Sequence, residues 1–353
     1  MLELYLQTLK ESGEDIPDWV SSVRFCYDEN LDNAAAYVDA DDNSIVFGPY
    51  ATPHAIFHEL EHIRSRHKKR CIGLDEEFNQ VEYYNVGFSN SGFNGVFLEE
   101  GFNELAARKL SIRACKNDSE KLTQLYKEFR ENKYYNFEMY ICFSICSLLN
   151  IKVSNIYKMK FSGDSSSQEF LDKKFEEISN NPNAWKDLQA KLDLYEYAKK
   201  SLKGDDFATS YKKLQLFGYA EQAYDILFKA LENHAISSNE CIKRLRQFDY
   251  YLKKSQNFIN FKVQDDFATA KQESIKRNKR VITRNHILTY VGKNRKKITS
   301  DNGFVWSGDL IDYIPAKKPS LPWFILSLYE KNSNLEKSIS SMEPLIEESA
   351  LGL

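Results

Sequence analysis

The hydrophobic and polar positions near the start of the chain predict a helix, a β-hairpin and a second helix. Apolar residues recur every three or four positions over 2–12, which is typical of an amphipathic helix. Two strand-like runs, 34–38 and 44–48, flank turn-forming residues at 41–43, so we expect a hairpin. A helix-starting Thr-Pro pair then precedes a helical pattern from 54 to about 67.

The remaining pattern predicts mostly helices. The apolar run 137–151 is interrupted by polar residues and is shorter than a membrane span, so we expect a buried helix. Beyond it the chain is rich in Lys, Glu, Leu and Tyr, with apolar residues at helical spacing. We therefore expect an α+β fold with three parts: a domain containing a short sheet over 1–115, a mainly helical domain over 116–314, and a proline-containing C-terminal segment over 315–353.

Composition and charge narrow the class of protein. The 353 residues are 42% apolar and 14% aromatic, which is too apolar for a disordered chain, and the net charge of −3 gives no overall attraction to nucleic acid. The N-terminus lacks a basic start followed by an apolar block, and the six cysteines include no Cys-x-x-Cys pair. We expect a globular, cytoplasmic protein without a membrane span, and the oligomeric state stays open.

The motif that carries chemistry is His58-Glu59-Leu60-Glu61-His62, an HExxH sequence. At about 100° per residue, His58 and His62 lie about 40° apart on one helical face, so both imidazoles can bind one Zn²⁺. Glu59 lies about 100° around the helix from His58, within reach of a water on that metal. The alternative is a helix whose histidines are ordinary core or surface residues.

Two further histidines and a run of cations surround the motif. His54 lies one turn before His58 on nearly the same face, but a fourth histidine ligand would close the site, so we expect it beside the ligands. His67 faces away and is expected at the surface. The cations between Arg64 and Arg70 suit the negative end of the helix dipole and are expected at a solvated helix end.

A catalytic zinc site needs a third protein ligand. A metzincin would have glycine at 65 and histidine at 68, where this chain has Ser65 and Lys68, so that class is excluded. Downstream, Glu100 and Glu104 lie one turn apart, on the face opposite an apolar stripe. The alternative for these acids is an exposed, acidic helix start.

This part of the chain resembles the gluzincin metallopeptidases, in which HExxH is followed by a helix that supplies a glutamate ligand. Glu100-Gly101-Phe102 matches the segment of that helix, while Glu99 stands where the family often has asparagine. The resemblance implies a zincin-like N-terminal domain, Glu100 as the third zinc ligand and Glu104 as an outer acceptor that orients a histidine. Glu99 would be the ligand instead if the helix were rotated.

The resemblance covers roughly 34–110 and implies hydrolysis of peptide bonds by a metal-activated water, with Glu59 as the general base. It also implies that strand 44–48 presents an edge to an extended peptide substrate. The 37 residues between His62 and Glu100 exceed the usual gap, so we expect an inserted loop, in which Tyr83 or Tyr84 could donate a hydrogen bond to an oxyanion.

Two alternatives to a peptidase stay open. The first is a non-catalytic helical scaffold with a structural or degenerate metal site. The second is a nucleic-acid-associated protein, because the segment 271–297 carries ten Lys or Arg against the single acid Glu273. A solvated helix face, or contacts with the acidic remainder of the chain, would also account for this segment.

Overall fold

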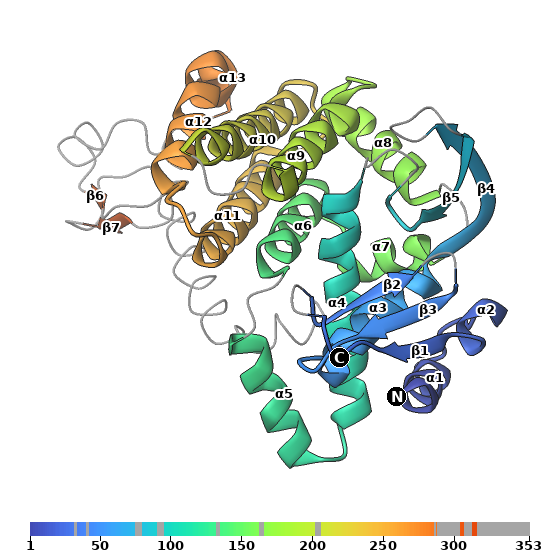
Figure 1. Ribbon diagram of the computed structural model, residues 1–353. Helices are drawn as coiled ribbons and strands as arrows, with labels where there is room; N and C mark the ends of the chain where they lie inside the picture. Colours follow the sequence, from blue (N-terminus) through green and yellow to red (C-terminus); the bar gives the residue numbers. More distant parts are fainter. Residues whose placement is uncertain are drawn as a thin grey trace.

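A computed structural model shows a mostly helical α+β fold with a three-stranded sheet at one end (Figure 1). The structure describes residues 1–31, 34–39, 42–74, 80–89, 95–131, 135–161, 166–201, 206–285, 287, 304–306 and 313–315, and in the hairpin 67–86 it describes the backbone alone. The N-terminal elements are α1 (Leu2–Glu11), α2 (Asp18–Ser21), β1 (Arg24–Tyr27), β2 (Ala36–Asp39), β3 (Ser44–Phe47), α3 (Pro53–Arg64), β4 (Arg66–Leu74), β5 (Gln80–Val86) and α4 (Val96–Cys115).

Helices dominate the rest of the described chain. In order, the elements are α5 (Ser119–Glu131), α6 (Asn136–Leu149), α7 (Val153–Lys160), α8 (Ser166–Ser179), α9 (Ala184–Ser201), α10 (Asp206–Glu232), α11 (Ser238–Ser255), the 3₁₀ turn η1 (Gln256–Phe258), α12 (Gln264–Arg277), α13 (Lys279–Arg284), β6 (Phe304–Trp306) and β7 (Tyr313–Pro315). The expected segment 315–353 lies outside the described residues after 315.

The predicted hairpin is present as β2 and β3, which pair antiparallel with Ala36 opposite Phe47. The expectation that strand 44–48 presents a free edge is wrong. β1 pairs with β3 in parallel on its other side, so the strand order is β1-β3-β2 and β3 is central. Among the strands that the structure describes, β2 pairs with β3 alone, and β2 packs against α3.

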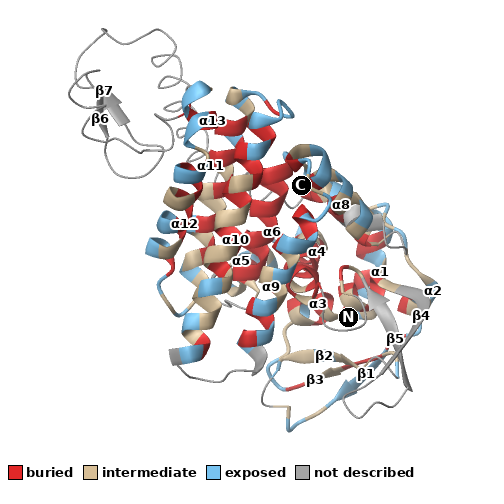
Figure 2. Cartoon of the chain, turned by 90° about the horizontal axis from the view of Figure 1, so that it is seen from above, coloured by how far each residue is buried: buried red, intermediate tan, exposed pale blue. Residues whose placement is uncertain are grey.

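Helix α4 belongs to two hydrophobic cores. The N-terminal core lies between α1, α3 and the sheet and includes Ala107 and Leu110 of α4. The helical core extends from α4 through α6, α9, α10 and α11, and takes Phe97, Phe102 and Leu105 from the same helix. Figure 2 shows the buried residues of the helical part as a continuous layer. The two helices expected to carry the metal ligands, α3 and α4, therefore lie where the two cores meet.

Helix α6 is the buried helix expected over 137–151, and all of its residues are buried. Glycine at 101 lets α4 approach it closely, because a Cβ there would lie 2.5 Å from Sγ of Cys142 and 2.8 Å from the carbonyl oxygen of Glu138. Among the described residues, no helix combines the length and the apolar character needed to cross a membrane.

The end of α3 differs from the expectation. α3 ends at Arg64, about one turn before the predicted end, and His67 lies in β4. Arg64 is buried rather than solvated, and its guanidinium pairs with Glu14 at 2.9 Å and Glu61 at 3.6 Å. The expected inserted loop contains the two-stranded hairpin β4–β5, which sequence periodicity did not reveal.

Candidate metal centre

Helix α3 begins where the sequence predicts and carries both histidines of the motif. The Thr52 hydroxyl accepts a hydrogen bond from the backbone N–H of Ala55 at 3.2 Å, and Pro53 occupies the first helical position. Ile56, Leu60 and Ile63 are buried in the N-terminal core, which sets the rotation of the helix. His58 and His62 consequently face α4, one turn apart.

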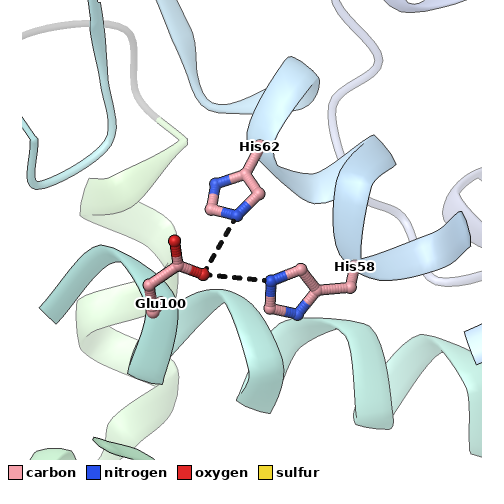
Figure 3. A group of neighbouring side chains, drawn as sticks. All are labelled: His58, His62 and Glu100. Carbon is pink, nitrogen blue, oxygen red and sulfur yellow. Dashed lines mark hydrogen bonds and ion pairs between the residues drawn. The ribbon is translucent and has the colours of Figure 1, made fainter. Parts of the chain in front are cut away.

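Helix α4 brings the third side chain. Its start has no side-chain cap of its own, but Asp193 of α9 accepts hydrogen bonds from the backbone N–H of Gly95 at 3.0 and 2.9 Å. The Asn103 side chain donates to the carbonyl oxygen of His58 at 2.6 Å and ties the two helices together. Figure 3 shows Glu100 reaching from α4 to both imidazoles of α3.

One nitrogen of each histidine and one oxygen of Glu100 lie close enough together to hold a metal ion. Oε2 of Glu100 lies 3.2 Å from Nε2 of His58 and 3.4 Å from Nε2 of His62, and one ligand atom from each residue falls within 4.8 Å of the others. Tetrahedral zinc with bonds of about 2.1 Å separates its ligand atoms by about 3.4 Å. His58, His62 and Glu100 could therefore hold a metal ion, and the two separations from Oε2 of Glu100 are compatible with zinc.

Glu104 contacts Nδ1 of His58, the ring nitrogen that faces away from Glu100. This matches the outer-acceptor role that the resemblance implied for Glu104. Nδ1 of His58 lies 3.1 Å from Oε2 of Glu104, whose other oxygen accepts from Arg108 at 2.6 Å. His54 contacts the same carboxylate, with Nε2 at 3.0 Å, and its Nδ1 lies 3.1 Å from the Ser111 hydroxyl. His54 thus lies beside the three candidate ligands rather than among them.

Glu99 contacts Nδ1 of His62 in the same way. Nδ1 of His62 lies 3.2 Å from Oε1 of Glu99, and this carboxylate also accepts from the Ser65 hydroxyl at 3.2 Å and from the backbone N–H of Phe88 at 2.8 Å. Lys160 of α7 forms an ion pair with it. The structure therefore separates the two candidate glutamates, with Glu100 between the Nε2 atoms and Glu99 behind His62.

The expected alternative of an exposed acidic helix start is wrong. Glu99 and Glu104 are 3% and 4% exposed, and each has a cation beside it. Burial would raise the pKa of Glu99, but Lys160 and His62 lower it to about 2. Burial likewise opposes the charge on Glu104, while His54 and Arg108 hold the pKa of that carboxyl well below its usual range. Both carboxylates are ionised acceptors.

Without metal, the two motif histidines are held in the protonated form. Burial opposes the charge on each imidazole, yet Glu100 and Glu104 raise the pKa of His58 to about 10, and Glu100 and Glu99 raise that of His62 to about 9. A carboxylate only accepts hydrogen bonds, so ring nitrogens facing carboxylates on both sides must both carry protons. A divalent cation would replace the protons on Nε2.

Glu59 lies at the edge of this group and is half-buried. Burial, together with the charge of Glu100, raises the pKa of Glu59, against the opposing influence of His58 and His62. The backbone N–H of Val38 in β2 donates to its carboxylate. The side chain thus lies near both the candidate metal ligands and β2.

Tyr135 is a site residue that the sequence analysis missed. Its ring stacks on His58 with the centroids 4.9 Å apart and the planes 7° from parallel. The charge of Glu100 and burial raise the pKa of its phenol well above the usual value, so the hydroxyl stays protonated. Nothing in its local sequence distinguishes it from the other tyrosines of the chain. The side chains of Tyr83 and Tyr84, in β5, lie outside what the structure describes.

In the described part of the basic segment 271–297, several cations pair with acids of the same chain. Lys271 binds Asp249 at 2.6 Å, and Lys276 pairs with Glu273. Arg277 pairs with two acids of α10, Glu221 and Asp225, each at 2.6 Å. The pairs of Lys271 and Arg277 match one of the two alternatives given for this segment, which is contact with the acidic remainder of the chain.

Comparisons with protein-family models, with curated proteins and with solved structures found no match for this chain. The resemblance to the gluzincins therefore rests on the HExxH motif, the Glu100 segment and the geometry around them.

Proposed function

We propose that the chain is a zinc-dependent peptidase with a zincin-like N-terminal domain. His58, His62 and Glu100 would hold the metal. The observation that carries this proposal is that the two nitrogens of each imidazole have different partners. Each Nδ1 faces a buried carboxylate, and both Nε2 atoms face the same oxygen of Glu100, Oε2. Carboxylates behind the ligating histidines are typical of zinc sites, where they fix the tautomer and the ring orientation.

When bound, Zn²⁺ would polarise the scissile carbonyl and lower the pKa of a water in its open position to about 7. Glu59 would accept the proton of the attacking water and later donate it to the leaving amine. Its environment supports both steps, because burial raises the pKa of the carboxyl toward the range in which it can accept and release a proton.

The substrate would add to β2 rather than to β3. The backbone N–H of Val38 donates to the carboxylate of Glu59, so this strand lies directly beside the proposed general base. An extended peptide paired with the edge of β2 would bring a scissile bond to Glu59 and the metal ligands. Tyr135, whose ring stacks on His58 and whose phenol is protonated, would be a further candidate beside Tyr83 and Tyr84 to donate a hydrogen bond to the tetrahedral oxyanion.

The test is Glu59→Gln in the full chain. We expect the variant to bind zinc like the wild type and to lose peptide hydrolysis by at least about 100-fold, because the amide cannot accept the proton of the water. Zinc content after purification and cleavage of a mixed peptide pool, followed by mass spectrometry, measure the two properties.

His58→Ala and Glu100→Ala are the controls, and both should lose zinc and hydrolysis together. Hydrolysis retained by Glu59→Gln would contradict the general-base assignment. A wild-type chain that binds zinc but cleaves no peptide would favour the non-catalytic scaffold. Retardation of nucleic acid at low salt that disappears at moderate salt would instead favour a role for 271–297.

A further inference from the structure

Lys160 is a charged side chain buried beside the proposed metal centre. It lies at the end of α7, is 0% exposed, and forms an ion pair with Glu99. Its ammonium also lies 3.4 Å from the hydroxyl of Ser65, the residue that follows α3. A lysine is rarely buried completely, because removing its charge from water costs several kcal/mol unless a partner compensates for it. The partner here is the carboxylate that contacts a proposed metal ligand.

Contacts on several sides hold Glu99. One oxygen faces Nδ1 of His62 at 3.2 Å and the Ser65 hydroxyl at 3.2 Å, while the other accepts from the backbone N–H of Phe88. The chain also closes over the ion pair at Gly87, where a Cβ would lie 2.1 Å from Oε2 of Glu99 and 2.8 Å from Nζ of Lys160. The pair is thus enclosed, and Lys160 supplies the cation that compensates for the buried charge of Glu99.

We propose that Lys160 is a positioning residue of the metal centre, which holds Glu99 so that Glu99 orients the His62 imidazole with Nε2 toward the metal. The inference rests on the proposed zinc site. Lys160 belongs to α7, which follows α6 and is remote in sequence from the HExxH motif. The proposal therefore gives the helical part of the chain a direct role in the metal centre.

Loss of the Lys160 charge leaves the Glu99 carboxylate buried with one cation fewer. The carboxylate is then held by fewer contacts, and its hydrogen bond to Nδ1 of His62 weakens. Changes to residues that orient zinc ligands typically lower metal affinity about 10- to 100-fold. We expect a loss in this range for Lys160→Met.

The experiment compares Lys160→Met with Lys271→Met, a matched control. Lys271 is also buried, at 5% exposed, and pairs with Asp249. It lies in α12, which Figure 1 shows on the far side of the helical part from α3. Zinc affinity is measured by competition with a chelator on the full-length proteins. We expect about 10- to 100-fold weaker binding in Lys160→Met and wild-type affinity in Lys271→Met, although both variants lose thermal stability.

A second measurement reports on His62 itself. In ¹⁵N NMR spectra of the zinc-loaded protein, the Nδ1 proton of His62 should resonate far downfield in the wild type and in Lys271→Met, and shift or disappear in Lys160→Met. The double variant Glu99→Gln/Lys160→Met removes both buried charges and keeps the proposal testable if the single variant does not fold. It should bind zinc no more weakly than Glu99→Gln alone, because Lys160 acts through Glu99.

Wild-type zinc affinity and an unchanged His62 signal in Lys160→Met, or a double variant that binds zinc more weakly than Glu99→Gln alone, would overturn the inference and leave the proposed function standing. Equal losses of affinity in Lys160→Met and Lys271→Met would also overturn it, since they would indicate a general effect of stability. A wild-type chain that fails to bind zinc would instead refute the proposed function.

Discussion

At the residue scale, three carboxylates surround the imidazoles of His58 and His62 in the proposed site, and each ring nitrogen faces one of them. Glu104 and Glu99 take the Nδ1 atoms, and Glu100 lies between the Nε2 atoms. Each of the outer carboxylates is in turn paired with a cation, Arg108 or Lys160. Since a buried carboxylate needs such compensation to stay charged, the cations are part of the arrangement that presents the histidines.

This arrangement predicts that zinc binding releases protons. With pKa values raised to about 10 and about 9, His58 and His62 are protonated at pH 7 in the metal-free chain. Zinc binds neutral imidazole, so we expect release of about two protons at pH 7 and an affinity that increases with pH up to about 9–10. Isothermal titration calorimetry in buffers of different ionisation enthalpy measures the number.

His62→Ala serves as the comparison and should release about one proton fewer in whatever binding remains. A binding enthalpy independent of the buffer would show that the imidazoles are already neutral, contrary to the prediction.

At the scale of secondary-structure elements, α4 is positioned by its neighbours rather than by its own sequence. Its first residue follows a glycine with φ of 85°, and the cap is a carboxylate from another helix, Asp193. Its residues pack in both cores, so its rotation is set by contacts with α3 on one side and α6 on the other. That rotation places Glu100, and not Glu99, between the imidazoles.

Because Asp193 of α9 caps the start of α4, we expect the stability of the folded chain to depend on pH. Burial raises the pKa of Asp193 to about 6, although the backbone N–H of Gly95 favours its charged form. Because this pKa is higher in the folded than in the unfolded chain, the stabilisation linked to protonation is complete below pH 4 and is lost as the pH rises through about 6. Asp193→Asn keeps an acceptor and removes the charge.

We therefore expect the free energy of unfolding of Asp193→Asn, relative to the wild type, to increase by about 1–2 kcal/mol between pH 5 and pH 8. Urea unfolding at the two pH values measures this difference. Asp193→Ala, which loses the acceptor, should be less stable than Asp193→Asn at both. A difference that does not change with pH would show that Asp193 titrates normally.

At the scale of the whole molecule, the proposed site lies at the junction of the two cores. His58 and His62 belong to α3, which is anchored in the N-terminal core, and Glu100 belongs to α4, which is shared with the helical core. Tyr135 and Lys160 reach the same place from the start of α6 and the end of α7. A metal at this position would link parts of the chain that pack largely separately.

Zinc should therefore stabilise the whole chain. At a free zinc concentration about 100-fold above its Kd, the free energy of unfolding should increase by about 2.7 kcal/mol, because the ion binds the folded state alone. Thermal unfolding with graded zinc and with a chelator measures the effect. Glu59→Gln should retain the stabilisation and Glu100→Ala should lose it. Equal shifts in both variants would indicate that zinc binds elsewhere.

The local chemistry of the site was predictable because it depends on helix geometry within a few residues. The Thr-Pro start and the spacing of HExxH place His58 and His62 on one face of α3. The hairpin and the buried helix 137–151 were likewise predictable, because turn chemistry and a long apolar run are local signals. The error at strand 44–48 has a non-local cause: β1, whose four residues are all exposed, pairs beside it.

By itself, then, the sequence determined which side chains share a helical face, because the period of an α-helix depends only on the backbone. The tertiary structure alone decided which face of α4 meets α3, which strand is at the edge, and that Tyr135 and Lys160 reach the site. Those outcomes depend on burial shared among segments far apart in the chain, and no local pattern encodes how such segments pack against one another.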